Sequence, residues 1–571
     1  MRAFLLKAQL FGLITALILQ AMAVQPATAE ERAHGRSMVI THYGIVATSY
    51  VQASQAGARI LERGGSAIDA GIAANAVLSV AEPMMNGIGG DLFAIYWESK
   101  TGKLYGLNAS GWAPQALTME HFKSRHIAAM PQSGIDSVTV PGAVDGWTKL
   151  HDRFGKLPWK TLFQPAIYYA KNGIPIPEAI HAYWEAAAPG LRANPESQRT
   201  YLPNDQAPAI GQIFRNPQLA DTLTTLADRG ESAFYKGSIA EAILKTSDHL
   251  GGTLTADDLA SYSAEWVDPV STTYRDWTVY ELPPNGDGIA ALEMLNIMEQ
   301  TQPDPEGPLS AAELHTRIES MKLAYADVKA YDGDPKFSTI PVPELISKPF
   351  AAKRAALINP AVANCKVAPG ALTGSDTTYL SVVDKEGNIL SLIQSNYSAF
   401  GSNVTVEGQG FVLQNRGGLF SLDPKSPNAL AGHKRPFHTI IPGFMQKGDQ
   451  HIGFGIMGGL NQPLAHAQFV SNVVDYHMNI QAAMEAARFT VNAKLGCNIV
   501  IESRVPQVTL DQLTKMGHIL DVHSQYSTTM GRGQAVLTDS ATNTHYGASD
   551  PRADGSAEPE YPKLPWVIVL K

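Results

Sequence analysis

The stretch TTYLSVV at residues 377–383 is followed by the segment DKEGN at 384–388 and by the stretch ILSLIQS at 389–395. Apolar and β-branched residues on both sides of a short polar segment with a glycine predict two antiparallel strands joined by a tight turn. If the turn is centred on Glu386, Thr377 lies directly opposite Ser395 on one face of the hairpin. The Cβ atoms of these two residues would then be about 4.5–5.5 Å apart.

Two hydroxyl groups in this arrangement have two interpretations. Thr377 and Ser395 could be a nucleophile and the group that positions it. Hydroxyl pairs across strands also occur as purely structural hydrogen bonds. The hairpin alone favours the structural interpretation.

Length and composition restrict what the rest of the chain can be. With 571 residues the chain is long enough for several packed layers. Hydrophobic residues make up 44% and charged residues 17%, which excludes a mostly disordered chain or a coiled coil. Its 44 basic and 53 acidic residues give a net charge of −9 without long runs of one sign. We therefore expect no nucleic-acid partner and no anionic membrane surface as a partner.

The N-terminus has the pattern of a secretory signal. Arg2 and Lys7 precede an apolar run at 10–19, and the small residues Ala27-Thr28-Ala29 follow. The apolar run is shorter than the ~20 residues that a membrane-spanning helix needs. We expect a signal peptide at 1–29, cleavage before Glu30, and an exported mature chain that is periplasmic or secreted and not bound to a membrane.

The chain has two cysteines, Cys365 and Cys497. They are too few for a disulfide framework, a structural zinc site or an iron–sulfur cluster. One bridge between them and two unpaired buried thiols both fit the sequence.

Along the chain, the sequence predicts mainly helices first, then strands, and then a mixture of helices and strands. Residues 158–260 have a mainly helical pattern, in which Asn216 is a candidate N-cap for a helix at 217–228. Ser310 and Glu313 have capping-box spacing before a helix at 311–331. Further helices are expected at 51–62 and 67–80, and strands at 92–97, 379–383, 389–394 and 410–413.

The run from Asp376 to Asp384 resembles the processing-site motif of the γ-glutamyltransferases, a family of N-terminal-nucleophile hydrolases. The similarity extends along nearly the whole mature chain, in ordered motifs whose combination is more specific than any one of them. These motifs are GGSAIDA at 64–70, GIGG at 87–90, VPGAV at 140–144, DGDP at 332–335, KRP at 434–436 and MGG at 457–459.

The resemblance implies a precursor that cuts its own backbone between Asp376 and Thr377. The products would be a large chain of residues 30–376 and a small chain of residues 377–571. An α-amine freed on Thr377 can act as the base for its own hydroxyl, which then attacks the amide of a small-molecule substrate and forms an acyl-enzyme. The implied fold is α+β, an αββα four-layer sandwich formed by both chains. This chemistry needs no metal and no organic cofactor.

Three further residues match the catalytic groups of the family. Ser395 stands where family members usually carry a threonine that hydrogen-bonds the nucleophile. Gly458 and Gly459 match the backbone N–H donors that stabilise the oxyanion, a contribution of typically ~10²–10³ in rate. A plain turn is the other interpretation of a Gly-Gly pair.

The substrate-binding positions depart from the family. Ser110 stands where an arginine that binds the substrate α-carboxylate is expected, and one hydroxyl cannot replace a bidentate guanidinium. Leu419 replaces an acidic group that binds the α-amine. His438 and Thr439 replace a serine pair, and Tyr397 replaces an asparagine or a similar residue.

Arg416 could be a new carboxylate anchor or a surface arginine, and the sequence favours neither. His438 could contact the substrate or be a structural histidine, and we slightly favour contact with the substrate. This pattern is similar to the branch that contains oxamate amidohydrolase and some cephalosporin acylases.

Three functions follow as hypotheses. The first is an exported, self-processing γ-glutamyltransferase or glutathione hydrolase. The second is an amidohydrolase or acylase for another small carboxylated acyl group, such as an oxamate-like or glutaryl-like one. The third is an unprocessed binding protein without turnover, against which the matching Thr377, Ser395, Gly458 and Gly459 argue.

Overall fold

The computed structural model describes residues 34–331, 333–367, 376–491 and 496–562. All helices and strands named below belong to the unit Arg36–Lys571. The predicted signal peptide at 1–29 and Asp332 of the DGDP motif lie outside the described residues. No helix in the described part of the chain is long and apolar enough to span a membrane.

The predicted hairpin is formed by strands β10 (Asp376–Val383) and β11 (Ile389–Tyr397). Their antiparallel register pairs Thr378 with Gln394 and continues without a shift to Val383 and Ile389, as a turn centred on Glu386 requires. The register shifts between Asp376 and Thr378, so Asp376 pairs with Tyr397. The first residues of β10 therefore form an irregularity at the end of an otherwise regular ladder.

The hairpin lies in the middle of a seven-stranded antiparallel sheet with the order β19-β2-β10-β11-β3-β4-β7. Both of its strands are paired on both sides, which fixes their position better than an edge would. The other strands of this first sheet are β19 (Ser556–Pro559), β2 (Ile45–Thr48), β3 (Asp91–Glu98), β4 (Lys103–Ala109) and β7 (Glu265–Val267).

A second seven-stranded sheet, of order β1-β18-β17-β13-β12-β9-β8, packs against the first. Glycines in β13 allow the close approach, because a Cβ at Gly455 would lie 2.4 Å from the ring of Tyr379. At Gly453 the carbonyl accepts a hydrogen bond of 3.1 Å from the Ser381 hydroxyl. The strands are β1 (Val39–Thr41), β18 (Thr544–Ser549), β17 (Arg532–Asp539), β13 (Gln450–Met457), β12 (Gly443–Lys447), β9 (Trp277–Glu281) and β8 (Val270–Tyr274).

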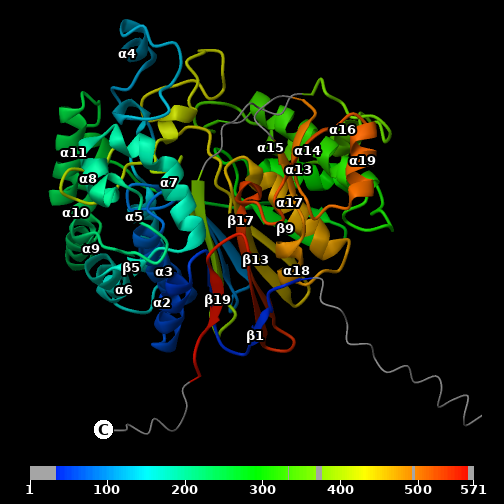
Figure 1. The fold of residues 1–571 in the computed structure, drawn as a ribbon, viewed down its shortest axis with the longest axis horizontal. Helices are drawn as coiled ribbons and strands as arrows, with labels where there is room; N and C mark the ends of the chain where they lie inside the picture. The colour runs from blue at the N-terminus through cyan, green and yellow to red at the C-terminus, as the bar shows by residue number, and fades with distance from the viewer. Residues whose placement is uncertain (1–33, 332, 368–375, 492–495, 563–571) are drawn as a thin grey trace, which may run out of the picture. The chain divides into compact units, whose positions relative to one another are not determined.

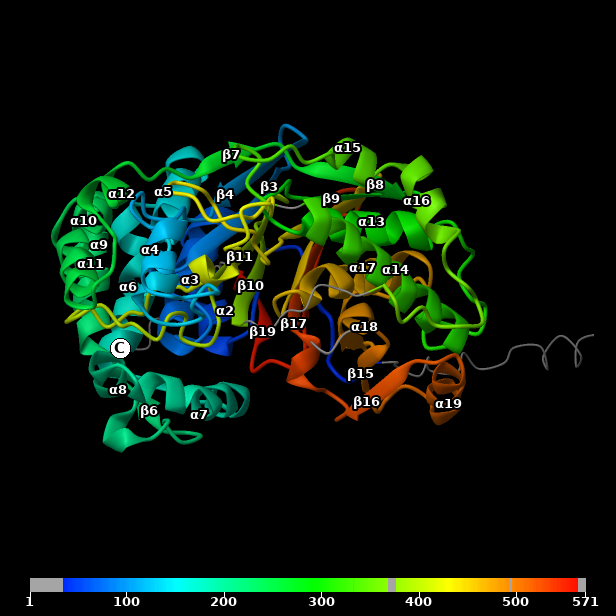
Figure 2. The same ribbon diagram turned by 90° about the horizontal axis from the view of Figure 1, so that it is seen from above.

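Helices cover the outer face of each sheet (Figures 1 and 2). One apolar core lies between the first sheet and its helices and between the two sheets, and a second core lies beneath the helices of the second sheet. The predicted αββα four-layer sandwich is confirmed. The helices that contact the first sheet are α2 (Val51–Glu62), α3 (Ala67–Ala81) and α5 (Ala143–Phe154); α6 (Trp159–Asn172) packs on α3, and α9 (Pro217–Arg229) packs on α6. The helices that contact the second sheet are α13 (Gly288–Met298), α17 (Asn461–Val474) and α18 (Ile480–Glu485); α14 (Ala311–Tyr331) packs on α13.

The remaining elements lie around this sandwich. The helices are α4 (Met119–Ser124), α7 (Glu178–Arg192), α8 (Pro195–Tyr201), α10 (Ser232–Tyr235), α11 (Ser238–His249), α12 (Ala256–Ala260), α15 (Val342–Leu345), α16 (Lys348–Ala355) and α19 (Gln507–Lys515). Two small sheets consist of β5 (Ile174–Pro175) with β6 (Ile213–Phe214), and of β14 (Phe489–Val491), β15 (Asn498–Glu502) and β16 (Ile519–His523).

Most of the predicted elements are confirmed within one or two residues, including the N-cap of α9, where the Asn216 side chain accepts from Leu219 N. The capping box before α14 is only half formed. Ser310 accepts from the backbone of Glu313, while the Glu313 carboxylate accepts from Asp304 N instead.

The strand predicted at 410–413 is wrong. Only Val412 in this run forms a β-bridge, and that bridge is isolated. The carbonyl of Gly410 accepts hydrogen bonds from the Tyr201 hydroxyl and from the Asn216 side chain. The backbone N–H of Val406 donates to the carbonyl of Phe411, and the backbone N–H of Leu413 donates to the carbonyl of Val404. The run therefore forms one isolated bridge beside this loop and no longer ladder.

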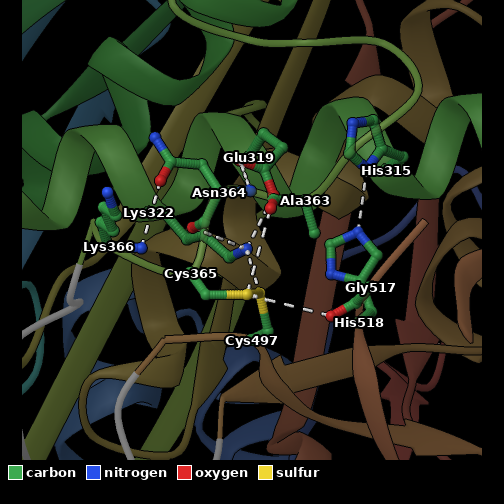
Figure 3. Close-up of a disulfide and its surroundings, with 10 residues drawn as sticks. All are labelled: His315, Glu319, Lys322, Ala363, Asn364, Cys365, Lys366, Cys497, Gly517 and His518. Carbon is green, nitrogen blue, oxygen red and sulfur yellow. Dashed lines mark hydrogen bonds and ion pairs between the residues drawn. A yellow bond between two sulfur atoms is a disulfide. The ribbon is translucent and has the colours of Figure 1, made fainter.

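Cys365 and Cys497 form a disulfide, with their Cα atoms 4.9 Å apart (Figure 3). Of the two alternatives that the sequence left open, the bridge is the one that occurs. Residues 132 positions apart are thereby joined.

Candidate active site

Thr377 and Ser395 face each other at the irregular end of the β10–β11 hairpin. The Thr377 hydroxyl donates a hydrogen bond of 3.1 Å to the Ser395 hydroxyl, which also accepts from the backbone N–H of Tyr397 at 2.8 Å. Both side chains are fully buried in the uncleaved chain. The predicted hydroxyl pair is therefore present, and Ser395 holds the Thr377 oxygen in one place.

The neighbouring hydroxyl, that of Thr378, is engaged elsewhere. It donates a hydrogen bond of 2.5 Å to the carboxylate of Glu82, which directly follows α3. Burial raises the pKa of Glu82, and the positive charge of Arg532 opposes this rise. Glu82 thus anchors the start of β10 to the helical layer. The two adjacent threonines therefore have different hydrogen-bond partners.

Gly458 and Gly459 form the bend between β13 and α17. Both have positive φ, 135° and 61°, a conformation that favours glycine. Ser381 contacts Gly453, and Tyr379 packs on Gly455. The strands β10 and β13 therefore face each other and run in opposite directions.

Arg416 lies in a short 3-10 helix, Arg416–Leu419, and its side chain is fully buried. The interpretation as a surface arginine is therefore wrong. Its Nη1 donates to the Thr439 hydroxyl at 2.8 Å, and the guanidinium lies over the ring of Tyr397 at 4.7 Å. Nε and Nη2 have no hydrogen-bond partner among the described residues. Burial lowers the pKa of Arg416 to about 10, so the group still carries its charge at neutral pH.

His438 is paired with a carboxylate that the sequence analysis missed, Asp91 at the start of β3. The Nε2 of His438 donates to Asp91 Oδ2 at 3.2 Å, and the backbone N–H of Ile440 donates to Nδ1 at 3.4 Å. Burial and the charge of Arg416 hold the pKa of His438 well below its ordinary value, so the ring is neutral. Both ring nitrogens therefore have protein partners, and the expected contact of His438 with a substrate stays a prediction.

Asp91 itself is subject to opposing influences. Burial raises its pKa to about 7, against the opposing effects of Arg416 and of hydrogen bonds from the backbone of Gly111 and Gly142. The Gly142 N–H lies 3.1 Å from Asp91 Oδ1. A glycine-rich run before a strand is the one sequence signal that pointed to this region, and it did not single out the acid.

Asp287, also missed from the sequence, precedes α13 without capping it. Its backbone N–H donates to the carbonyl of His438 at 3.1 Å, so its main chain adjoins the same group of residues. Its carboxylate is fully buried, and neither oxygen has a hydrogen-bond partner within the described ranges. Burial raises the pKa of Asp287, and the positive charge of Arg416 opposes this rise.

The Ser110 hydroxyl belongs to a network of buried amides. It donates to Asn108 Oδ1 at 2.7 Å and accepts from Asn285 Nδ2 at 3.3 Å. The Ser110 carbonyl accepts from the Arg435 side chain at 3.0 Å. The position that departs from the family is thus filled by protein–protein hydrogen bonds.

One group of side chains resembles a metal site. Ligand atoms of His315, Glu319 and His518 all lie within 4.8 Å of one another. The two histidines are hydrogen-bonded to each other at 2.8 Å, however, and Glu319 accepts from the buried Lys322 ammonium at 2.7 Å (Figure 3). A buried ammonium beside the carboxylate disfavours a divalent cation, so we interpret the group as a hydrogen-bonded network.

Comparisons with known proteins agree with this geometry. The sequence profile of the family described as Gamma-glutamyltranspeptidase matches residues 53–560. The glutathione hydrolase-like YwrD proenzyme of Bacillus subtilis is 36% identical over 529 residues, covering 91% of this chain and 99% of that protein. The oxamate amidohydrolase proenzyme of Klebsiella pneumoniae is 33% identical, with coverage of 91% and 99%.

A solved structure supports the same assignment. The cephalosporin acylase from Bacillus halodurans superposes with a TM-score of 0.87 at 40% identity, covering 94% of this chain and 99% of that one. Sequence and fold are thus shared over nearly the whole length with proteins named for the hydrolysis of different acyl amides. The chain belongs to the gamma-glutamyltranspeptidase family of N-terminal-nucleophile hydrolases.

Proposed function

We propose that this chain is an exported precursor that cuts itself between Asp376 and Thr377 and then hydrolyses γ-glutamyl-type amides. The hydroxyl pair of Thr377 and Ser395 and the proenzyme names of the relatives support self-processing. Attack of Thr377 Oγ1 on the carbonyl carbon of Asp376 converts the peptide bond into an ester and frees the α-amine. Water then splits the ester, leaving a carboxylate on Asp376 and a hydroxyl on Thr377.

In the mature enzyme, Thr377 Oγ1 attacks the substrate carbonyl while its own α-amine accepts the hydroxyl proton. The N–H groups of Gly458 and Gly459 stabilise the oxyanion. The carbon–nitrogen bond then breaks, and the leaving amine takes the proton from the α-amine. Water releases the acyl group from Thr377 and regenerates the hydroxyl, or an amine does so in a transfer reaction.

The observation that carries the choice of substrate is that buried polar atoms of Arg416 and Asp287 lack hydrogen-bond partners among the described residues. Two guanidinium nitrogens of Arg416 and both carboxyl oxygens of Asp287 have no hydrogen-bond partner among the described residues, and the positive charge of Arg416 acts on Asp287. Buried polar atoms without partners are costly, so a ligand that pairs with them would stabilise the site. A carboxylate would pair with the charged Arg416, and a cationic group would favour the ionised form of Asp287 against the burial that raises its pKa. An α-carboxylate for Arg416 and an α-ammonium for Asp287 describe the head of a γ-glutamyl group.

The second candidate is an amidohydrolase for a carboxylated acyl group without an amine. It is supported by Leu419 at the position where the family's acidic group is expected and by the names of the oxamate amidohydrolase and cephalosporin acylase relatives. In that case Asp287 would be protonated and would take no part in binding.

The test compares kcat/KM for a γ-glutamyl anilide and for the matching glutaryl anilide, which lacks only the α-amino group. We expect the wild-type enzyme to prefer the γ-glutamyl anilide, and Asp287→Asn to lose that preference while it keeps glutaryl hydrolysis. A glutaryl preference in the wild type would establish the second candidate. A chain that stays uncut and is inactive toward both anilides would support the third hypothesis, an unprocessed binding protein.

A further inference from the structure

We infer that the Cys365–Cys497 disulfide joins the large and the small chain covalently after maturation. This inference rests on the proposed cleavage before Thr377. Cys365 precedes that point and Cys497 follows it, so a bond within the precursor becomes a bond between two chains in the product. The mature enzyme is then one covalent molecule.

The large-chain side of the bond is held by several contacts (Figure 3). The carbonyl of Asn359 accepts from His315 Nε2 at 2.8 Å, and the backbone N–H of Asn364 donates to Glu319 at 3.2 Å. The backbone N–H of Ala363 donates to the carbonyl of Met516 at 2.8 Å. The network that resembles a metal site therefore has a structural role, which is to seat the segment that ends in Cys365.

The small-chain side is equally well defined. Cys497 directly precedes β15, and its carbonyl accepts from the backbone N–H of Ile519, where β16 begins. A Cβ at Gly496 would lie 2.9 Å from the carbonyl oxygen of Cys365, so a glycine is needed where the two chains meet. The sheet β14–β15–β16 consists of small-chain strands only. The bond thus fastens the last part of the large chain to a layer built by the small chain.

The fold determines what such a bond can change. In the first sheet, β10, β11 and β19 belong to the small chain, while β2, β3, β4 and β7 belong to the large chain. Interleaved chains cannot separate unless the protein unfolds. The bond therefore adds little to the stability of the folded state itself. In the unfolded state it keeps the two chains together, which lowers the entropy of that state and makes refolding independent of concentration.

The bond is accessible from one side. Cys497 is 1% exposed, whereas Cys365 lies at the surface. A dithiol reductant can therefore attack the sulfur of Cys365, and the products are two cysteine thiols and the oxidised reductant. An oxidising compartment, as expected for an exported protein, would preserve the bond.

The test is denaturing electrophoresis of purified mature protein, blocked with N-ethylmaleimide, with and without dithiothreitol. We expect one band at the mass of both chains without reductant and two bands with it. Cys365→Ser and Cys497→Ser should each give two bands under both conditions. Two bands from the wild type without reductant would overturn the inference. One band under both conditions would contradict self-processing. The inference would then also be wrong, because it requires two chains.

A second measurement tests the consequence for stability. The midpoint of thermal unfolding of the oxidised mature enzyme should not change with protein concentration. In Cys365→Ser, where unfolding releases two separate chains, a hundredfold dilution should lower the midpoint by about 2 °C. An equal concentration dependence in both proteins would contradict a covalent link between the chains. Thr377→Ala with Cys365→Ser is the matched control, because its single chain should show no concentration dependence.

Discussion

The β10–β11 hairpin and the buried group of Arg416, Asp91, His438 and Asp287 are the two halves of the proposed site, and they differ in how they are built. In the hairpin, Thr377 and Ser395 come from adjacent strands of one sheet, and their hydroxyls meet at 3.1 Å where the regular register of the hairpin ends. The residues of the buried group come from β3, a 3-10 helix and the loops before α13 and β12. The difference shows that pairing of adjacent strands holds the proposed nucleophile, whereas long-range packing holds the proposed acyl-binding groups.

The largest expected effect is that of Thr377→Ala, which removes the proposed nucleophile. We expect an uncut chain without turnover of either anilide, measured by electrophoresis and by anilide hydrolysis. Thr378→Ala is the matched control, because this neighbouring hydroxyl binds Glu82 and should not be needed for cleavage. A cut Thr377→Ala protein would place the processing site, and with it the nucleophile, elsewhere.

A smaller but still large effect is expected for Arg416→Gln. Hydrogen bonds to charged groups contribute about 1.5–3 kcal/mol each, so losing a two-pronged contact should raise KM for a carboxylated anilide about 10²-fold. An anilide without a carboxylate, such as a butyryl anilide, should be hydrolysed at the wild-type rate. Arg416→Lys keeps the charge without the planar fork and should lie between the two. Equal losses for both substrates would show that Arg416 only supports the fold.

Ser395 should matter less than either. Ser395→Ala removes one neutral hydrogen bond to the nucleophile, typically about 0.5–1.5 kcal/mol, so maturation and turnover should slow about 2- to 10-fold. Ser395→Thr retains the hydroxyl and should restore both rates. Wild-type rates in the alanine variant would remove Ser395 from the mechanism and return the hydroxyl pair to a structural role.

The smallest effect is expected for Asp91. It is a change in the pH dependence of the free energy of unfolding, and it tests the buried group through stability. Its pKa of about 7 in the folded protein is above the ordinary value of 3.8, so between these pH values the folded state binds more protons than the unfolded state. Asp91 therefore makes the free energy of unfolding fall as pH rises from about 4 to about 7.

Urea unfolding at pH 5 and pH 7.5 measures this contribution. Asp91→Asn cannot ionise, so the loss of stability between the two pH values should be smaller in the variant than in the wild type. His438→Gln, which removes the partner of Asp91 and keeps a side-chain N–H donor, is the matched comparison. An unchanged difference in Asp91→Asn would mean that other groups cause the pH dependence.

The hairpin shows how much of the site was predictable. Apolar and β-branched runs around a polar turn predict a register in which Thr377 lies opposite Ser395. The strands β10 and β11 have this register from Thr378 and Gln394 to the turn, but it shifts between Asp376 and Thr378. Ordered motifs identified the family and therefore the four-layer sandwich. Gly410 shows where prediction from the sequence fails. The run at 410–413 has the pattern of a strand, but the carbonyl of Gly410 accepts hydrogen bonds from the side chains of Tyr201 and Asn216.

Arg416 and Asp287 show what could not be predicted. The sequence left Arg416 open between a surface residue and an anchor, and Asp287 carried no signal beyond a place before a helix. Whether a charge is buried and unpaired depends on which distant segments pack around it. The same holds for Cys365 and Cys497, since the sequence allowed both a bridge and two thiols.

The sequence by itself predicted the hairpin that carries Thr377 and Ser395, because turn residues and strand patterns act over short distances. The family and the layered fold followed from the resemblance of its ordered motifs to a known family, and not from periodicity. Only the tertiary structure decided that Arg416 and Asp287 are buried with polar atoms that lack partners among the described residues, and that Cys365 meets Cys497 across the proposed cleavage point. Burial and long-range contact are properties of the packed molecule. A local pattern of residues does not contain them.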